Sequence, residues 1–308
     1  WGQDAADFAD AQHLVFDCGP LGEGNHGHFD AMSFELAAFG KSLVVDPGRY
    51  TYSEAIDPRD GVNWRVHFRG TSAHNTVCID GKQQTSYLPK LIKELSRHTQ
   101  GSVRHKISGP AAEAQLLERS HSAHLDLLHG GVRSHEYDAL HQRCIVFVNR
   151  DYWIVSDWLR APGEHEYTLN FQLGAQAQDH TELKRNEGLR VHSPGLLLAQ
   201  TLRADVQHKL ADGWVSQRYG EKRPAPALRS TIKSSNANFD TLLLPWRDIE
   251  PTVHLEDVAV EARGANITAP SALRIHLQSG DKRTTDFWFH SHDKEVLNWR
   301  IDRFEFTG

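Results

Sequence analysis

Polar and apolar residues alternate over short stretches of this chain, as in β-strands with one buried face. Runs rich in Val, Ile, Leu, Phe and Thr recur between Gly, Asn, Asp or Pro residues, and no segment carries a long apolar period of 3.6 residues. The predicted strands are Leu14–Asp17, Phe34–Phe39, Leu43–Val45, Thr76–Ile79, Cys144–Val148, Tyr152–Asp157, Tyr167–Leu173, Leu196–Leu202, Leu242–Leu244, Leu273–Leu277 and Asp286–Phe289. We therefore expect an all-β fold, a large antiparallel β-sandwich of many short strands with few helices.

Short polar stretches between these runs predict how the strands connect. Asn149-Arg150-Asp151 has the composition of a turn, and the second and third predicted strands form a hairpin that turns near Gly40-Lys41. A turn at that point places Asp46 opposite Glu35. Pro224-Ala225-Pro226-Ala227 is interpreted as a loop, and no repeat or low-complexity linker divides the chain.

Composition narrows the class of protein. With 308 residues, 39% of them hydrophobic and 24% charged, the chain suits a soluble globular protein with one large β domain or two ordinary ones. No apolar run approaches the roughly eighteen residues of a membrane span. The net charge of −6 argues against a broad basic surface for nucleic acid, so an anionic partner would need a local cluster of Arg, His or metal. The chain opens on Trp1, and we interpret it as a piece of a longer protein.

Three cysteines, Cys18, Cys78 and Cys144, lie in apolar runs without a C-x-x-C pair. Their odd number and their surroundings predict buried thiols and not a disulfide framework.

Candidate metal chemistry is concentrated in three short motifs, namely His26-Gly27-His28-Phe29-Asp30, Val44-Val45-Asp46-Pro47-Gly48 and Thr71-Ser72-Ala73-His74-Asn75. Two His and one Asp are ligand types that hold zinc, whereas calcium would prefer more oxygen ligands. In an extended strand His26 and His28 would share one face. Because residue 35 would then lie about 20 Å from His28 at ~3.3 Å per residue, residues 29–32 must curl back to bring His28 to Asp46.

The order of these motifs resembles the C-terminal domain of heparinase II/III-like polysaccharide lyases. The resemblance is specific from Leu14 to Gly81 and runs through Gly24-Asn25-His26-Gly27-His28-Phe29-Asp30, Ser33-Phe34-Glu35-Leu36, Val45-Asp46-Pro47-Gly48 and Ala73-His74-Asn75-Thr76-Val77. It continues more weakly through Arg143–Phe147, Asp151–Val155 and Tyr219-Gly220. The resemblance implies zinc ligands at His28, Asp46 and His74, and a single β-sandwich domain (supersandwich) over residues 1–308. It also implies an α/α toroid domain upstream in the parent protein, which this chain lacks.

Family members cleave uronic-acid glycosides by β-elimination, which requires removal of the C5 proton, neutralisation of the carboxylate and protonation of the leaving oxygen. The residue matching His26 lies in the cleft that faces the toroid, so the resemblance implies a catalytic role for His26. The usual Tyr and Asn or His partners belong to the toroid. Tyr50 and Tyr52 are the local candidates for a second acid or base, no motif selects between them, and we take Tyr52.

The long segment Pro47–Ser72 shows no clean strand. Its aromatic and Arg residues suit sugar stacking and carboxylate binding. We expect Arg65 and Arg69 there, together with Asn25, to bind substrate. Asp30 could orient a ligating His or cap the next turn, and His135 and His141 are expected to pack.

Two other functions compete with the lyase. One is a non-catalytic carbohydrate-binding or exopolysaccharide-biosynthesis accessory sandwich, which a toroid upstream of this chain would argue against. The other is a cupin-like metal enzyme, but its first motif needs Glu at about Met32 or Ser33, and here the acid is Glu35. On the lyase reading the partners are an anionic polysaccharide and the toroid, with no nucleic acid, and we expect a periplasmic or cell-envelope location.

Overall fold

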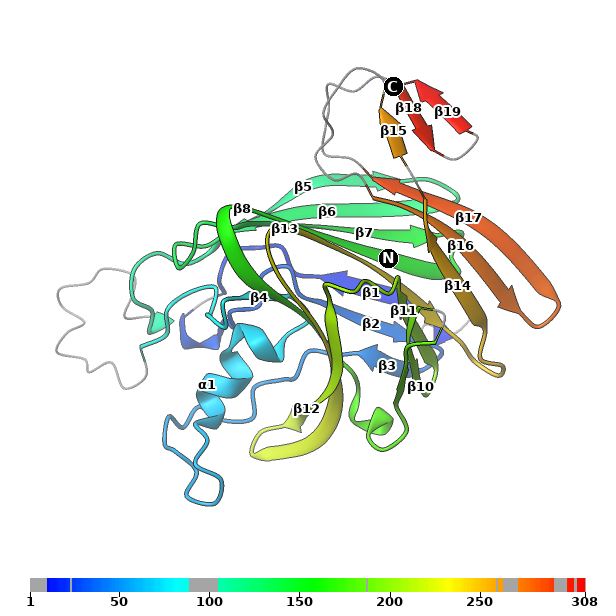
Figure 1. Ribbon diagram of the computed structural model, residues 1–308. Coiled ribbons are helices and arrows are strands. Elements are labelled where there is room, and N and C mark those ends of the chain that lie inside the picture. The colour runs from blue at the N-terminus through cyan, green and yellow to red at the C-terminus, as the bar shows by residue number, and fades with distance from the viewer. Residues whose placement is uncertain are drawn as a thin grey trace.

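In the computed structural model the strands form a layered β-sandwich (Figure 1). The structure describes residues 10–22, 24–88, 105–186, 188–258, 260–262, 271–290, 298–301 and 304–307. Within these residues, one sheet holds β1 (His13–Phe16), β2 (Phe34–Ala38) and β3 (Lys41–Val44), in that order. A second sheet of ten strands follows the order β5-β6-β7-β8-β13-β11-β10-β9, with β4 paired to β8 and β12 paired to β13.

The strands of the large sheet are β4 (Val77–Ile79), β5 (Glu113–His121), β6 (Leu125–Arg133), β7 (Leu140–Val148), β8 (Tyr152–Gln172), β9 (Glu182–Lys184), β10 (Leu189–Ser193), β11 (Leu196–Gln200), β12 (Gln207–Arg218) and β13 (Glu221–Pro245). A third sheet has the order β14 (Thr252–Asp257), β16 (Ser271–Ser279) and β17 (Lys282–His290). The fourth has the order β15 (Val260–Ala262), β18 (Asn298–Ile301) and β19 (Phe304–Thr307). All strand pairs are antiparallel, and the predicted all-β sandwich is confirmed.

Both faces of the large sheet are covered, which follows from the alternation of its side chains. On β8, Trp153 and Val155 join the main core, which also contains Leu36 of β2 and Val44 of β3. Their neighbours Tyr152 and Ile154 point to the opposite face, where they meet apolar residues of β14 and β16. The β1–β3 sheet and the β14-β16-β17 sheet therefore pack on opposite faces of the large sheet.

Two strands are longer than predicted. The runs expected as separate strands from Tyr152 and Tyr167 join in β8, which has 21 residues, and the Leu242–Leu244 run belongs to β13, which has 25. The loop predicted at Pro224–Ala227 is wrong, because this stretch lies within β13. Since β8 ends opposite Ala227, the two prolines are paired only with β12, and a strand position with one free side tolerates proline.

The hairpin of β2 and β3 turns one residue earlier than predicted. Phe39 has φ 53° and Gly40 has φ 73°, as in a two-residue turn with both central residues left-handed. A bulge follows, and Leu36 pairs with Val44, whereas the predicted register would pair it with Val45. The turn predicted between β7 and β8 is confirmed, with positive φ at Asn149 and Arg150.

The segment predicted as a long loop contains the helix α1 (Trp64–Arg69), which is labelled in the lower left of Figure 1 and packs on η3. The side chain of Asn63 caps it by accepting a hydrogen bond from the Val66 N–H. Three short 3-10 turns, η2 (Gly24–His26), η3 (Thr71–Ala73) and η5 (Ala175–Ala177), complete the described helical elements. Among the described residues, no helix has the length and apolar character needed to cross a bilayer.

The cysteines are unpaired, as expected, but one environment differs from the prediction. Cys78 and Cys144 are buried, whereas Cys18 is partly exposed because it follows the edge strand β1. Burial raises the pKa of the Cys144 thiol to about 12, which keeps that thiol protonated and inert.

Candidate metal centre and catalytic pair

The segment that carries His26 and His28 is a compact loop and not a strand. Residues Gly24–His26 form the 3-10 turn η2, and the chain then curls back at Ala31-Met32, as the sequence required for His28 to reach Asp46. The expectation that His26 and His28 share one strand face is therefore wrong. Gly27 is needed at the centre of this loop, because a Cβ there would lie 2.9 Å from the Gly22 nitrogen.

Arg65 and Arg69 support the loop of His26 and His28 through hydrogen bonds to its backbone carbonyls. Both side chains are fully buried. The guanidinium group of Arg65 donates to the Asn25 carbonyl, and Arg69 Nε donates to the Gly27 carbonyl at 2.8 Å. The structure thus gives these two predicted substrate-binding residues contacts that position the loop. Asn25 takes part in the same contact through its backbone and its side-chain oxygen.

His74 is fixed from both sides of its ring. It lies between η3 and β4, and its side chain is 0% exposed. Its Nδ1–H group donates to the Gly70 carbonyl at 2.8 Å, so a neutral ring presents the Nε2 lone pair to the neighbouring acids. That Nε2 atom lies 3.3 Å from Asp46 Oδ2, and the Gly48 N–H holds the other Asp46 oxygen at 2.7 Å.

Four side chains converge on one point. His28, Asp30, Asp46 and His74 each offer one ligand atom, and these atoms all lie within 4.8 Å of one another. Around His74 Nε2 the separations are 3.1 Å to His28 Nδ1, 3.3 Å to Asp46 and 3.9 Å to Asp30. Zinc bonds of about 2.1 Å in a tetrahedron give ligand separations of about 3.4 Å. The three separations around His74 Nε2 are close to this value, so the two nitrogens and two oxygens form a group that could hold a metal ion.

Burial and mutual contacts set the charges of this group. Burial and the adjacent His74 lower the pKa of His28 to about 3, so its ring is neutral at pH 7 and can act as a ligand. Burial would also lower the pKa of His74, but the bonded Asp46 carboxylate raises it to about 9. Burial raises the pKa of Asp30 to about 6. A bound cation would compensate the acids and displace the proton from His74.

His26 stands apart from this group and pairs with Tyr52. The Tyr52 hydroxyl lies 2.7 Å from His26 Nδ1, and the two rings meet edge to face. The structure therefore brings together both predicted catalytic residues from segments 26 positions apart. Tyr50, the other candidate, packs instead against Trp64 and Phe68.

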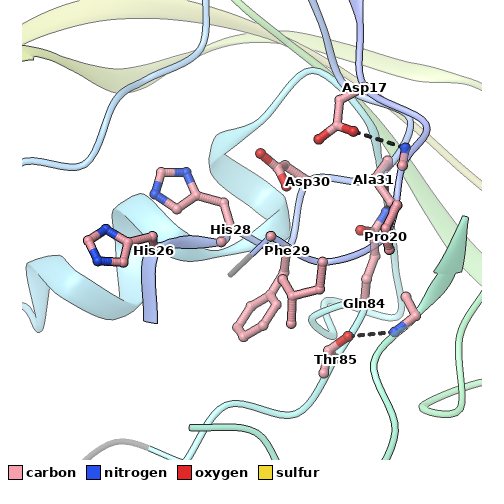
Figure 2. Close-up of a pocket in the computed structure, with 14 residues that line it drawn as sticks. Asp17, Pro20, His26, His28, Phe29, Asp30, Ala31, Gln84 and Thr85 are labelled. Carbon is pink, nitrogen blue, oxygen red and sulfur yellow. Dashed lines mark hydrogen bonds between the residues drawn. The ribbon is translucent and has the colours of Figure 1, made fainter. Parts of the chain in front are cut away.

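A surface pocket adjoins both arrangements (Figure 2). The rings of His26 and His28 lie at one end of it, and Asp30 and Asp17 line another side. A polar group bound in this pocket would contact His26, which is exposed. His74 is buried and does not line the pocket.

Of the two other histidines that were expected to pack, His141 does so and His135 does not. His141 is buried, and its Nε2 lies 2.6 Å from the Asp157 carboxylate. His135 is exposed beside Glu113.

Sequence reasoning gave Asp30 an auxiliary role and missed Arg143. Asp30 belongs to the converging group, and its spacing of two from His28 was the available signal. Arg143 pairs with Asp157 in the core and donates to the carbonyls of Met32 and Asn75, which lie two residues after Asp30 and one residue after His74. Nothing in the local sequence of β7 pointed to that role.

Comparisons with known proteins agree on one family. The family model "Heparinase II/III-like, C-terminal" matches residues 5–242. A heparin-sulfate lyase of Pedobacter heparinus is 26% identical over 243 residues, covering 76% of this chain and 32% of the relative. One of Bacteroides stercoris is 25% identical over 175 residues, covering 56% of this chain and 21% of the relative. The chain thus spans a third or less of the length of these relatives.

Solved structures show the same fold. The crystal structure of heparan sulfate lyase HepC from Pedobacter heparinus matches with a TM-score of 0.65 and 21% identity, covering 92% of this chain and 40% of that one. A crystal structure of heparinase III matches with a TM-score of 0.66 and 15% identity over the same shares.

Proposed function

This chain belongs to the heparinase II/III-like C-terminal family, and on that premise we propose that it is the β-sandwich domain of a polysaccharide lyase. The parent enzyme would cleave a uronic-acid-containing polysaccharide by β-elimination. Residues 1–308 would form a single domain, and an α/α toroid upstream in the parent would close the substrate cleft. The observation that carries the proposal is the contact of 2.7 Å between His26 Nδ1 and the Tyr52 hydroxyl, beside the pocket of Figure 2.

The pair suits the proton transfers of the reaction. An imidazole and a phenol in hydrogen-bond contact can remove one proton and deliver another, which is what loss of the C5 proton and departure of the glycosidic oxygen require. His26 is exposed and faces the pocket, so a sugar can reach it. In the parent, the C5 proton would be accepted either by one member of the His26–Tyr52 pair or by a group of the toroid acting with this pair.

His28, Asp30, Asp46 and His74 would hold zinc as a structural ion. Zinc bound there would tie the loop of His28, the turn of Asp46 and the segment of His74 into one platform. Because four protein ligands fill a tetrahedral site and β-elimination needs no activated water, the proton transfers are assigned to His26 and Tyr52.

Mutation of His26 in the complete parent protein tests the function. Formation of the conjugated unsaturated uronate would be followed by ultraviolet absorbance on heparan sulfate, alginate and bacterial exopolysaccharides. We expect His26→Ala and Tyr52→Phe each to lower turnover by about 10²- to 10⁴-fold on the cleaved polymer, with unchanged zinc content. His192→Ala is the matched control, since His192 Nδ1 also makes one contact, 2.6 Å from Glu250 in the loop between β13 and β14.

Unchanged turnover in His26→Ala would reject the catalytic assignment. Absence of any unsaturated product from the intact parent, with retained sugar binding, would favour the non-catalytic carbohydrate-binding alternative. The isolated chain is expected to turn over poorly in either case, since each missing acid or base costs about 10²- to 10⁴-fold and the toroid would supply part of the cleft.

A further inference from the structure

Arg49 is an exposed cation held between two aromatic rings next to the catalytic pair. Its guanidinium carbon lies 4.5 Å from the ring centre of Tyr52 and 5.7 Å from that of Tyr219. One of its nitrogens donates to the Tyr52 hydroxyl at 2.5 Å, and the same hydroxyl contacts His26. Within the described part of the chain, no carboxylate forms an ion pair with Arg49, so its positive charge is oriented but not neutralised.

A hairpin far along the chain supplies Tyr219. The tip between β12 and β13 is tied to the segment of Arg49 by backbone hydrogen bonds, from the Ser216 N–H to the Pro47 carbonyl at 2.7 Å and from the Gly220 N–H to the Tyr50 carbonyl at 2.8 Å. The Tyr219 side chain stays 61% exposed. A large aromatic ring that is anchored through its backbone yet left open to solvent is suited to binding a flat apolar surface, such as one face of a sugar ring.

We propose that Arg49, Tyr52 and Tyr219 form a subsite for an anionic sugar residue, in which Arg49 binds a carboxylate or sulfate and Tyr219 stacks on the ring. This inference rests on the proposed function and names the residues that select its acidic substrate. Arg65 and Arg69, the anchors predicted from sequence, are buried behind the loop, whereas Arg49 is exposed.

The position of Arg49 fits the chemistry at His26. A guanidinium group has five N–H donors, and the hydrogen bond to Tyr52 uses one of them, so a fork of two donors can bind a carboxylate or sulfate. Because the Tyr52 hydroxyl touches both groups, a sugar whose anionic group is bound by Arg49 lies beside His26. The bound anion would also neutralise the positive charge of Arg49, which is a local cation on a chain whose net charge is −6.

Sugar binding to this full chain tests the subsite without requiring turnover. Three probes would be titrated calorimetrically: an unsulfated heparosan oligosaccharide, its neutral carboxyl-reduced derivative, and that derivative after sulfation. We expect Arg49→Ala to weaken binding of an anionic probe by about 10- to 100-fold and to leave the neutral probe unchanged. A loss with the first probe identifies the carboxylate as the recognised group, and a loss only with the third identifies sulfate.

Matched variants separate recognition from folding. Arg49→Lys keeps the charge without the fork and should recover part of the affinity. Tyr219→Ala should weaken all three probes, because stacking does not depend on charge. Arg247→Ala is the control, since Arg247 also lies over an aromatic ring, 4.8 Å from Phe39, and pairs with Asp10. All variants should keep the melting temperature within a few degrees of the parent chain.

The inference is overturned if Arg49→Ala binds the anionic probes as tightly as the unmodified chain. It is equally overturned if the neutral probe loses as much affinity as the anionic ones, or if the unmodified chain binds neither anionic probe better than the neutral one. The proposed lyase chemistry is judged separately by His26→Ala, so an anion subsite without turnover and turnover without this subsite are distinct results.

Discussion

The Nδ1 atom of His28 lies 3.1 Å from the Nε2 atom of His74, although 46 positions separate the two residues in the sequence. His74 donates its other ring proton to Gly70, so the Nε2 lone pair of a neutral ring is directed at His28. Two imidazole nitrogens at this distance either share a proton or face one another with their lone pairs. A cation that binds both removes that conflict, which makes the pair the centre of the proposed zinc site.

The first prediction concerns zinc. Metal-stripped chain should take up about one zinc ion, since the four converging groups supply one tetrahedral shell. Because the ligands come from three segments, zinc should raise the free energy of unfolding by about 2.7 kcal/mol when free zinc is about 100 times its dissociation constant. Elemental analysis and chemical denaturation with and without zinc measure both effects.

Ligand variants decide which groups hold the ion. His28→Ala and Asp46→Asn should abolish stoichiometric uptake, and Asp30→Asn should weaken it. His26→Ala should retain uptake, because His26 contacts Tyr52 and lies outside the converging group. Unchanged zinc in His28→Ala, or loss of zinc in His26→Ala, would contradict this assignment.

The second prediction concerns the buried ion pair that supports the ligand segments. Arg143 contacts both oxygens of Asp157 inside the core, and both side chains are 0% exposed. Arg143→Met should destabilise the fold by about 3–5 kcal/mol, because it removes the cationic partner of the buried Asp157 carboxylate and leaves only the contact with His141. Denaturant unfolding of the metal-free chain measures this cost. The double variant Arg143→Met with Asp157→Leu should recover part of it, and equal stability of the single and double variants would show that the unpaired charge is not the cause.

The sequence predicted which side chains converge better than it predicted their surroundings. His28, Asp46 and His74 could be chosen from their residue types and from the family resemblance, and their binding of zinc stays a prediction. The role of Arg65 and Arg69 could not, because it depends on α1, whose six residues are too few to show a helical period. In that helix, positions four apart share one face, and both guanidinium groups turn toward the loop of His26.

The choice between the two tyrosines also depended on backbone conformation. Tyr50 has φ 56°, a left-handed conformation that a sequence without glycine at that position does not indicate. The chain therefore changes direction between Tyr50 and Tyr52, so that one ring packs on α1 and the other reaches His26. The lengths of β8 and β13 escaped prediction for a related reason, since pairing along the sheet extends strands through residues with weak intrinsic preference.

The third prediction is a pH-dependent contact at His165. Its Nδ1 lies 2.7 Å from Asp80 and its Nε2 lies 2.8 Å from Asp138. The bond to Asp80 is the largest influence and raises the pKa of His165, with Asp138 acting in the same direction and partial burial opposing them. The stabilisation is therefore fully present below the ordinary pKa of about 6.5 and is lost as the pH rises through the higher folded value.

His165→Gln should accordingly cost stability at pH 6 and little at pH 9. The two acid partners are partly exposed, so solvent screening limits the difference to below about 1 kcal/mol. Urea unfolding of both proteins across this pH range measures it, and Asp138→Asn should reproduce part of the effect. A destabilisation that grows with pH would contradict the charge pairing.

The last prediction tests the attachment of the β12–β13 hairpin to the segment that bears Arg49. Gly48 has φ +80°, and a Cβ at this position would lie 2.1 Å from the Ser216 carbonyl oxygen, which is rigid backbone. Gly48→Ala must therefore displace the hairpin as well as strain its own backbone. It should lower the free energy of unfolding by more than ~1–3 kcal/mol, which is the cost of a left-handed conformation at a residue other than glycine. Gly61→Ala is the matched control, because Gly61 has φ +73° and no atom within 4 Å of the added Cβ.

Displacement of Tyr219 should weaken sugar binding in Gly48→Ala, whereas zinc uptake should persist, since Asp46 keeps its side-chain geometry through the backbone N–H of residue 48. Equal stability and equal sugar affinity of the two glycine variants would show that the contact between the hairpin and this segment does not position the subsite.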